Sequence, residues 1–312
     1  FIGFLIVLIS ALLLEYFDQS LNNPERTTRL LNLPVLGIFP KVFLKVQNTN
    51  FLFIANRLLE IIIQNIELQL SVSKSDKKTR TLLVFSALRN EGKTILIGNL
   101  AQKLKKQGKK VIILNFSHET LLTTETTQIG YRETPEKAAA KVKPIRKKKL
   151  SILSLILGYP DSRVDTESPF LELPEKYMSE GEHFVYNVNE QLYSVKNYKE
   201  ILEQNGFELS FVPDFVLIEL PPIVYYPYPV SLVSEADIPI LVCRSNRIWT
   251  TADQAALEVL MKLTTQQTHF ILNGVELPVI ETVLGDLPKK RSRFRRILKK
   301  LFRFDFLSRN QI

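Results

Sequence analysis

Three consecutive residues, Gly92-Lys93-Thr94, have the types and spacing that could bind a nucleotide. They follow a short apolar segment and precede an amphipathic one, which predicts a helix that begins directly after a strand. Backbone N–H groups at such a helix start point toward an anion, and the helix dipole favours negative charge there. A glycine permits close approach, a lysine reaches the outer phosphates, and a threonine hydroxyl binds Mg²⁺. The tripeptide therefore predicts a nucleotide-phosphate site, although Ala87 stands where the full phosphate-loop pattern has a glycine. An ordinary strand–helix turn is the alternative.

Further polar residues, Asn115, Glu219 and Asn273, lie at or near the ends of apolar segments that read as strands. Strands that alternate with helices predict a parallel sheet covered on both faces, and ligands of such sheets sit at the C-terminal strand ends. The predicted fold class is therefore α/β, a P-loop NTPase-like, mostly parallel sheet with helices on both faces. The expected strands are Thr81–Phe85, Lys110–Leu114, Asp214–Pro222, Asp237–Cys243 and His269–Asn273, and the expected helices include Phe51–Leu70, Ile95–Leu104, Leu150–Leu157, Asn197–Gln204 and Thr250–Leu263.

Composition excludes some classes of site. The chain has 312 residues, of which 45% are hydrophobic, enough to bury a sizeable core. Its single cysteine, Cys243, lies in an apolar segment, so an intrachain disulfide is excluded and a core position is expected. The three histidines, His118, His183 and His269, are too scattered for zinc-like spacing.

An apolar run, Phe1 to Leu14, opens the chain and ends at Glu15. As a helix it would span about 21 Å, short of the roughly 30 Å hydrocarbon core, so we interpret residues 1–17 as the C-terminal part of a transmembrane helix. A signal-peptide core or a buried helix is the alternative. Basic residues follow closely, which predicts that the rest lies on the cytoplasmic side of the membrane. Prolines and a glycine then punctuate residues 18–50, a connector with Val35 to Phe39 extended.

The C-terminal segment, residues 289–312, is strongly basic. Nine of the fifteen residues from Lys289 to Arg303 are Lys or Arg, and aromatic and aliphatic residues recur among them at helical spacing. A basic amphipathic helix of this kind predicts contact with anionic lipid at a membrane surface. A helix docked on its own domain and a nucleic-acid contact are the alternatives. The lysine run at Arg146–Lys149 is interpreted as a solvated loop, with nucleic-acid or lipid contact as the alternative.

Taken together, these segments resemble the cytoplasmic part of a bacterial polysaccharide co-polymerase fused to a P-loop tyrosine autokinase. Leu33-Pro34-Val35-Leu36-Gly37-Ile38-Phe39-Pro40 is similar to the juxtamembrane motif of that family. Glu91-Gly92-Lys93-Thr94, with Asn99-Leu100-Ala101 after it, is similar to its Walker A motif. Asp214 to Pro222 is similar to its Walker B motif, and Leu272-Asn273-Gly274-Val275 resembles the strand end that contacts the nucleotide base. The resemblance implies a P-loop kinase-like domain over residues 51–288.

The chain departs from this family at several functional positions. The second family motif supplies aspartates at the metal and catalytic centre, where this chain has Asn115 and Ser117. The Walker B aspartate is replaced by Glu219, a carboxylate on a longer arm. A family motif for subunit contacts aligns with Arg57, Glu60 and Ile63, which match it incompletely. No tyrosine lies beyond Tyr228, whereas the family ends in a tyrosine cluster that receives phosphate.

The resemblance implies a membrane-anchored component of exopolysaccharide or lipopolysaccharide assembly with a nucleotide-binding kinase-like domain, and the departures predict that this domain is catalytically weak. It assigns the cofactors ATP and Mg²⁺, with Glu91, Gly92, Lys93, Thr94 and Asn273 binding the nucleotide, Thr94 and Glu219 binding the metal, and Lys93 and Glu219 as the remaining catalytic groups. The implied partners are the bacterial inner membrane, other copies of the chain and the polysaccharide polymerase and export machinery, without nucleic acid. An active tyrosine autokinase, a structural chain-length regulator that binds no nucleotide and a partitioning-type ATPase are the alternatives.

Overall fold

The computed structural model describes residues 3–5, 8–9, 20–41, 51–72, 77–117, 178–179 and 181–285. Most of the N-terminal apolar run, the lysine run at 146–149, the expected helix at 150–157 and the whole basic C-terminal segment lie outside these residues. Among the described residues, no helix combines the length and apolar character needed to cross a bilayer.

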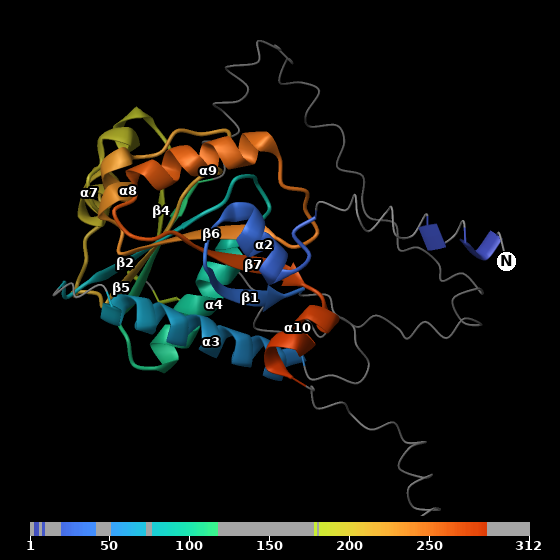
Figure 1. The fold of residues 1–312 in the computed structure, drawn as a ribbon. Helices are drawn as coiled ribbons and strands as arrows, with labels where there is room; N and C mark the ends of the chain where they lie inside the picture. Colours follow the sequence, from blue (N-terminus) through green and yellow to red (C-terminus); the bar gives the residue numbers. More distant parts are fainter. Residues whose placement is uncertain are drawn as a thin grey trace, which may run out of the picture.

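A seven-stranded sheet forms the centre of the molecule, and every neighbouring pair of its strands is parallel (Figure 1). The strand order is β1-β7-β6-β2-β5-β3-β4. Their bounds are β1 (Val35–Pro40), β2 (Arg80–Phe85), β3 (Val111–Phe116), β4 (His183–Tyr186), β5 (Phe215–Glu219), β6 (Ile238–Arg244) and β7 (His269–Val275). The predicted α/β fold with a parallel sheet is confirmed.

Helices cover both faces of the sheet (Figure 1). Two of them, α3 (Phe51–Val72) and α4 (Lys93–Lys106), bury residues such as Ile62 and Leu100 against one face. The other face is covered by α7 (Tyr198–Gln204), α8 (Val230–Glu235) and α9 (Thr251–Leu263), which bury residues such as Leu202 and Leu257. These two apolar layers keep the sheet rigid, so the polar groups at its C-terminal edge are held by fixed strands.

Several elements differ from the sequence-based expectation. The strand β4 was not predicted, because only four residues carry its pattern. The connector contains the helix α2 (Pro24–Leu31), and its extended part forms β1, which pairs with β7 at the edge of the sheet. Pro239 is accommodated near the start of β6, ahead of the ladder to β7, which begins at Ile240. The remaining elements are the short 3₁₀ helix η4 (Glu190–Ser194) and α10 (Leu277–Leu284).

The segment before α2 contacts the loop that follows β6. Ser20 forms an isolated antiparallel bridge with Ile248, and the backbone N–H of Leu21 donates to the carbonyl of Arg247 at 3.0 Å. The described segment 20–41 therefore begins beside the C-terminal edge of the sheet.

Candidate phosphate-binding site

The loop between β2 and α4 ends at Gly92, which is the N-cap of α4 and has a φ of 88°. This left-handed conformation favours glycine, and a Cβ at this position would also clash with the side-chain nitrogen of Asn273. The Asn273 amide donates to the backbone carbonyl of Glu91 at 2.7 Å, so β7 braces the loop from the side. Contact of Asn273 with a nucleotide base stays a prediction.

Lys93, the first residue of α4, is buried beneath the loop. Its ammonium donates to the Ser86 hydroxyl at 2.7 Å and lies 3.9 Å from a carboxylate oxygen of Glu219. It also lies 5.7 Å from the centre of the Phe116 ring. Burial lowers the pKa of Lys93, and the negative charges of Glu219 and Glu91 offset part of that effect. The lysine is thus positioned at the loop by Ser86, which follows β2, and by neighbours from β3 and β5.

Glu219 lies at the end of β5 and is only 2% exposed. The Thr94 hydroxyl lies 3.0 Å from each of its carboxylate oxygens. Burial raises the pKa of Glu219 to about 7, although the Lys93 charge and the Thr94 hydrogen bond act in the opposite direction. The hydroxyl of Tyr186 on β4 donates to the Glu219 carbonyl at 2.6 Å and holds this strand end in place. Threonine and carboxylate oxygens together are hard donors of the kind that Mg²⁺ prefers.

The Glu91 carboxylate contacts the end of β6 and the loop after it, and its predicted contact with nucleotide stays a prediction. Its carboxylate accepts from the backbone N–H of Arg244 at 2.6 Å and from the Arg247 guanidinium at 2.7 Å. Arg247 also pairs with Asp253, the residue that completes the capping box of α9 with Thr250. Sequence reasoning missed Arg247, because nothing local marks a residue whose partner lies so far away in the chain.

Asn115 and Ser117 lie at the end of β3, the neighbour of β5, as their place in the sequence predicts. The Asn115 side-chain nitrogen lies 3.1 Å from Nε2 of His183 on β4, on the side of β3 away from β5. The backbone N–H of Ser117 donates to the carbonyl of Tyr186 at 2.8 Å. Neither side chain can supply the negative charge that an aspartate would bring to the site.

The polar groups of these residues have the chemistry needed to bind a nucleotide together with Mg²⁺. Lys93 and the first backbone N–H groups of α4 would bind phosphate oxygens, and Thr94 and Glu219 would hold the metal. Within the part of the chain that the structure describes, no group of three or more His, Cys, Asp or Glu side chains could hold a metal ion. Nucleotide phosphates and water are the usual further ligands of Mg²⁺ at such a site.

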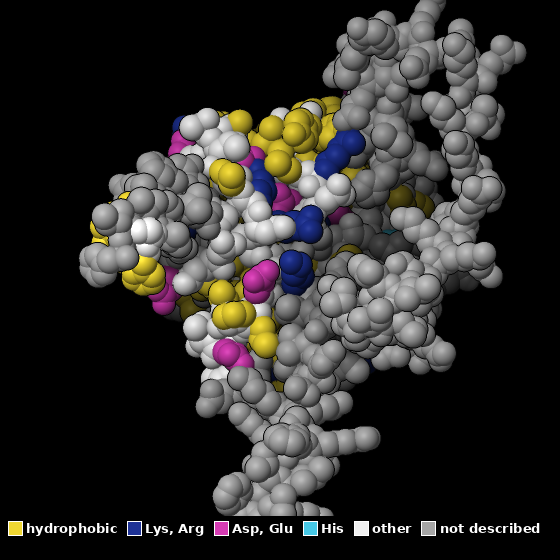
Figure 2. Space-filling view, turned by 90° about the vertical axis from the view of Figure 1, so that its right-hand side faces the viewer, with side chains coloured by type: hydrophobic (Ala, Val, Ile, Leu, Met, Phe, Trp, Pro, Cys, Tyr) yellow, Lys and Arg dark blue, Asp and Glu magenta, His cyan; other side chains and the backbone are white. Residues whose placement is uncertain are grey.

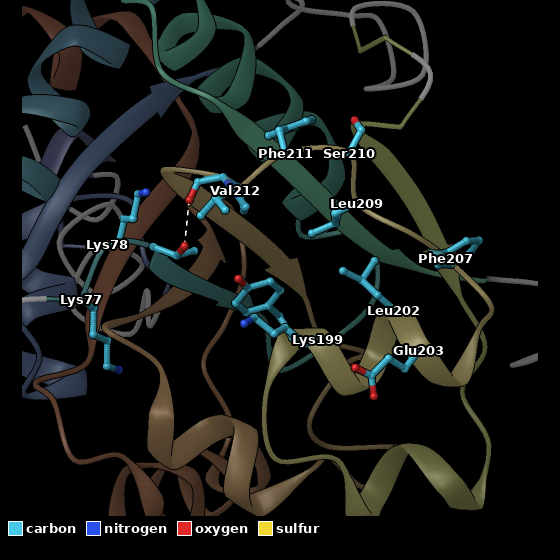
Figure 3. Close-up of a pocket in the computed structure, with 13 residues that line it drawn as sticks. Lys77, Lys78, Lys199, Leu202, Glu203, Phe207, Leu209, Ser210, Phe211 and Val212 are labelled. Atoms are coloured by element: carbon cyan, nitrogen blue, oxygen red, sulfur yellow. Dashed lines mark hydrogen bonds between the residues drawn. The ribbon is translucent and has the colours of Figure 1, made fainter.

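A separate hollow of about 730 Å³ lies at the other edge of the sheet, where β2 and β5 begin (Figure 3). The hydroxyl of Thr79 donates to the carbonyl of Pro213 at 2.8 Å across its floor. Apolar residues of the segment 207–213 line it together with lysines at the rim. This hollow contains none of the predicted site residues.

Comparisons with known proteins yield structural likeness only. No protein-family model and no curated protein matches the chain. Solved structures with a similar fold include the kinase domain of Escherichia coli tyrosine kinase ETK, with 15% identity over 83% of this chain and 95% of that one and a TM-score of 0.48. The chimerical protein CapA2B2 has 15% identity over 81% of this chain and 100% of that one, with a TM-score of 0.44. The BceF tyrosine kinase domain has 18% identity over 83% and 100%, with a TM-score of 0.41.

Proposed function

We propose that the chain binds ATP with Mg²⁺ at the loop Ser86–Thr94 and is a membrane-anchored component of polysaccharide assembly whose kinase-like domain is catalytically weak. The observation that carries the nucleotide proposal is the convergence of Lys93, Thr94 and Glu219 at the C-terminal edge of the sheet. The association with exopolysaccharide or lipopolysaccharide assembly rests on the juxtamembrane and Walker-type motifs in the sequence.

Each residue has a separate role in this proposal. Lys93 would leave Ser86 and donate to the outer phosphates, and Gly92 would let the backbone approach them. Bound Mg²⁺ would supply positive charge that neutralises the phosphates. Thr94 and Glu219 would hold that ion, and the bond from Tyr186 would keep the Glu219 backbone fixed.

Weak phosphoryl transfer follows from the groups that are absent. Asn115 and Ser117 offer no charge where the resembled kinases have aspartates, and removing one preorganised electrostatic group typically costs about 10²–10³ in rate. The sequence also has no tyrosine after Tyr228 to receive phosphate near its C-terminal end.

A structural role without nucleotide is the second candidate. It is favoured by the fact that the charged side chains of the loop already have partners within the protein. Lys93 is buried against Ser86 and Glu219, and Glu91 is fixed by Arg247. In this candidate, the ion pairs Lys93–Glu219 and Arg247–Glu91 stabilise the C-terminal edge of the sheet. An active autokinase, a further alternative, would have to use Glu219 as its metal carboxylate, because Asn115 and Ser117 carry no charge.

The proposed location is the cytoplasmic side of a bacterial inner membrane, anchored through the N-terminal apolar run. The proposed contacts are anionic lipid at Lys289–Arg303, other copies of the chain and the polysaccharide polymerase and export machinery. These contacts rest on sequence patterns, which lie largely outside the described residues.

One experiment separates the three candidates. The full chain is incubated with labelled ATP and Mg²⁺, and bound nucleotide and phosphotyrosine are measured together, beside Lys93→Met and the double change Asn115→Asp with Ser117→Asp. We expect bound ATP with little phosphotyrosine in the wild type, and more in the double variant. Robust phosphotyrosine in the wild type that is lost in Lys93→Met would support the active kinase. Absence of bound nucleotide would support the structural role.

A further inference from the structure

A second hollow, of about 460 Å³, lies between α2 and the loop after β6. Arg26, Arg29 and Leu30 line it from α2, and Trp249 lines it from the loop. The three α2 residues are spaced i, i+3 and i+4, so they lie on one side of the helix. The hollow thus combines two guanidinium groups with an indole ring and an aliphatic side chain.

In the part of the chain that the structure describes, the positive charge of this hollow has no acidic partner. Among the described residues, no acidic side chain pairs with Arg26 or Arg29, whereas nearby Arg247 is paired with Glu91 and Asp253. The Trp249 indole is already held, because its N–H donates to the side chain of Gln254 at 3.0 Å. In the described part of the chain, a ligand here would therefore meet the Arg26 and Arg29 guanidinium groups without an acidic partner, beside a fixed aromatic ring.

Apolar side chains are exposed beside the hollow. Leu30 is 47% exposed and Ile248, next to Trp249, is 59% exposed. The view onto one side of the molecule shows Lys and Arg side chains beside apolar ones, with Asp and Glu side chains among them (Figure 2). This combination is typical of a surface that lies against lipid headgroups, where aromatic and basic residues gather.

The position of the hollow along the chain limits its distance from the N-terminal apolar run. Ser20 is bridged to Ile248, and Leu21 is bonded to the carbonyl of Arg247. Only six peptide steps separate Leu14, where the apolar run ends, from Ser20. Even fully extended, they reach about 20 Å. If the apolar run is embedded in a bilayer, the hollow must lie close to that bilayer.

We propose that this hollow binds the phosphate headgroup of an anionic membrane lipid. Arg26 and Arg29 would donate to the phosphate oxygens, since planar guanidinium groups match phosphate geometry, and Leu30 and Ile248 would contact the region of the acyl chains. The proposal rests on the membrane anchoring proposed above, and it is independent of the nucleotide site. It is also distinct from the predicted lipid contact of the basic C-terminal segment.

Trp249 makes the test specific, because it is the single tryptophan of the chain. The full chain, held in a non-ionic detergent, is titrated with dihexanoylphosphatidylglycerol while the Trp249 emission is followed. Dihexanoylphosphatidylcholine and inorganic phosphate are parallel titrants. We expect phosphatidylglycerol to bind at least about tenfold more tightly than either of them, and the double variant Arg26→Gln with Arg29→Gln to weaken that binding about thirtyfold. The matched control, Lys196→Gln with Lys199→Gln, removes the same charge elsewhere and should bind like the wild type.

Three results would overturn the proposal: equal affinity for the two lipids, an unchanged response in the Arg26/Arg29 variant, or inorganic phosphate that binds as tightly as phosphatidylglycerol. The last result would identify a soluble phosphate as the ligand. Co-sedimentation of the full chain with neutral phosphatidylcholine vesicles tests the membrane anchor separately. A failure of the anchor and a failure of the headgroup site are therefore distinguishable.

Discussion

At the scale of single residues, the proposed site depends on the carboxylate of Glu219, whose burial disfavours the ionised form. Glu219 is almost fully buried, and its nearest polar neighbours are the Thr94 hydroxyl and the Lys93 ammonium. A metal ion at this position would compete with both the proton and the lysine. Binding of Mg²⁺ should therefore weaken as the pH falls below about 7, the value to which burial raises the pKa of Glu219.

The variant Glu219→Gln tests this burial through the pH dependence of stability. The folded chain keeps a proton on Glu219 that the unfolded chain releases between pH 4.5 and about 7. The stability from this group is fully present below pH 4.5 and is lost as the pH rises through 7. The wild type should lose up to about 1.4 kcal/mol of unfolding free energy per pH unit from this proton. Urea unfolding across that window should show a shallower slope in Glu219→Gln.

The control for this comparison is Glu203→Gln, which changes an exposed carboxylate. Burial also raises the pKa of Glu91, so the unfolding free energy of all three proteins should fall with rising pH for this second reason as well. Identical slopes in wild type and Glu219→Gln would mean that Glu219 is ionised throughout the window.

Arg247 is expected to contribute more to stability than a surface ion pair. Its replacement by glutamine would leave Glu91 and Asp253, which are 3% and 1% exposed, without their cationic partner. Breaking a buried pair in this way costs about 3–5 kcal/mol. Lys103→Gln is the control, because it breaks a more exposed pair with Glu60, worth about 0–1 kcal/mol. Urea denaturation should separate the two variants, and equal losses would contradict this assignment.

At the scale of elements, the edge of the sheet depends on the close approach of α3 to β1. A Cβ at Gly37 would overlap with Cγ1 of Ile62 on α3. The register of β1 against β7 also shifts between Val35 and Gly37. Glycine is needed here for space, so that α3 can pack against the strand.

Gly37→Ala should therefore destabilise the fold by about 1–3 kcal/mol through overpacking. Ile62→Ala alone should cost about 2–5 kcal/mol, because it leaves a cavity. In the double variant the new methyl group occupies part of that cavity, so the two losses should not add. A double-mutant cycle by chemical denaturation measures this coupling. Strict additivity would show that Gly37 and Ile62 do not constrain one another.

The elements differ in how far the sequence could predict them. β2, β3, β5, β6 and β7 are buried apolar runs with clear boundaries, so their positions were predicted. β1 was predicted as extended, but its pairing with β7 joins distant parts of the chain and has no local signal. The same contrast between local patterns and long-range contacts applies to the residues of the candidate site. Gly92, Lys93 and Thr94 form a local pattern, whereas the contacts of Arg247 with Glu91 become visible only in the folded chain.

At the scale of the whole molecule, the segment nearest the proposed membrane anchor and the proposed phosphate-binding loop both contact the loop that follows β6. The backbone carbonyl of Arg247 accepts from Leu21, and its side chain binds Glu91. Trp249, two residues further on, lines the proposed headgroup hollow. The C-terminal edge of the sheet thus brings the proposed lipid and nucleotide sites onto neighbouring segments.

The central claim is that the Lys93 loop binds ATP, and calorimetric titration of the full chain with ATP and Mg²⁺ tests it most directly. Loss of a charge-assisted phosphate contact costs about 1.5–3 kcal/mol, so Lys93→Met should bind ATP about tenfold to a hundredfold more weakly than the wild type. Lys109→Met, which changes an exposed lysine beyond the end of α4, should bind like the wild type. Equal affinities of Lys93→Met and the wild type, or no binding by the wild type, would contradict the account.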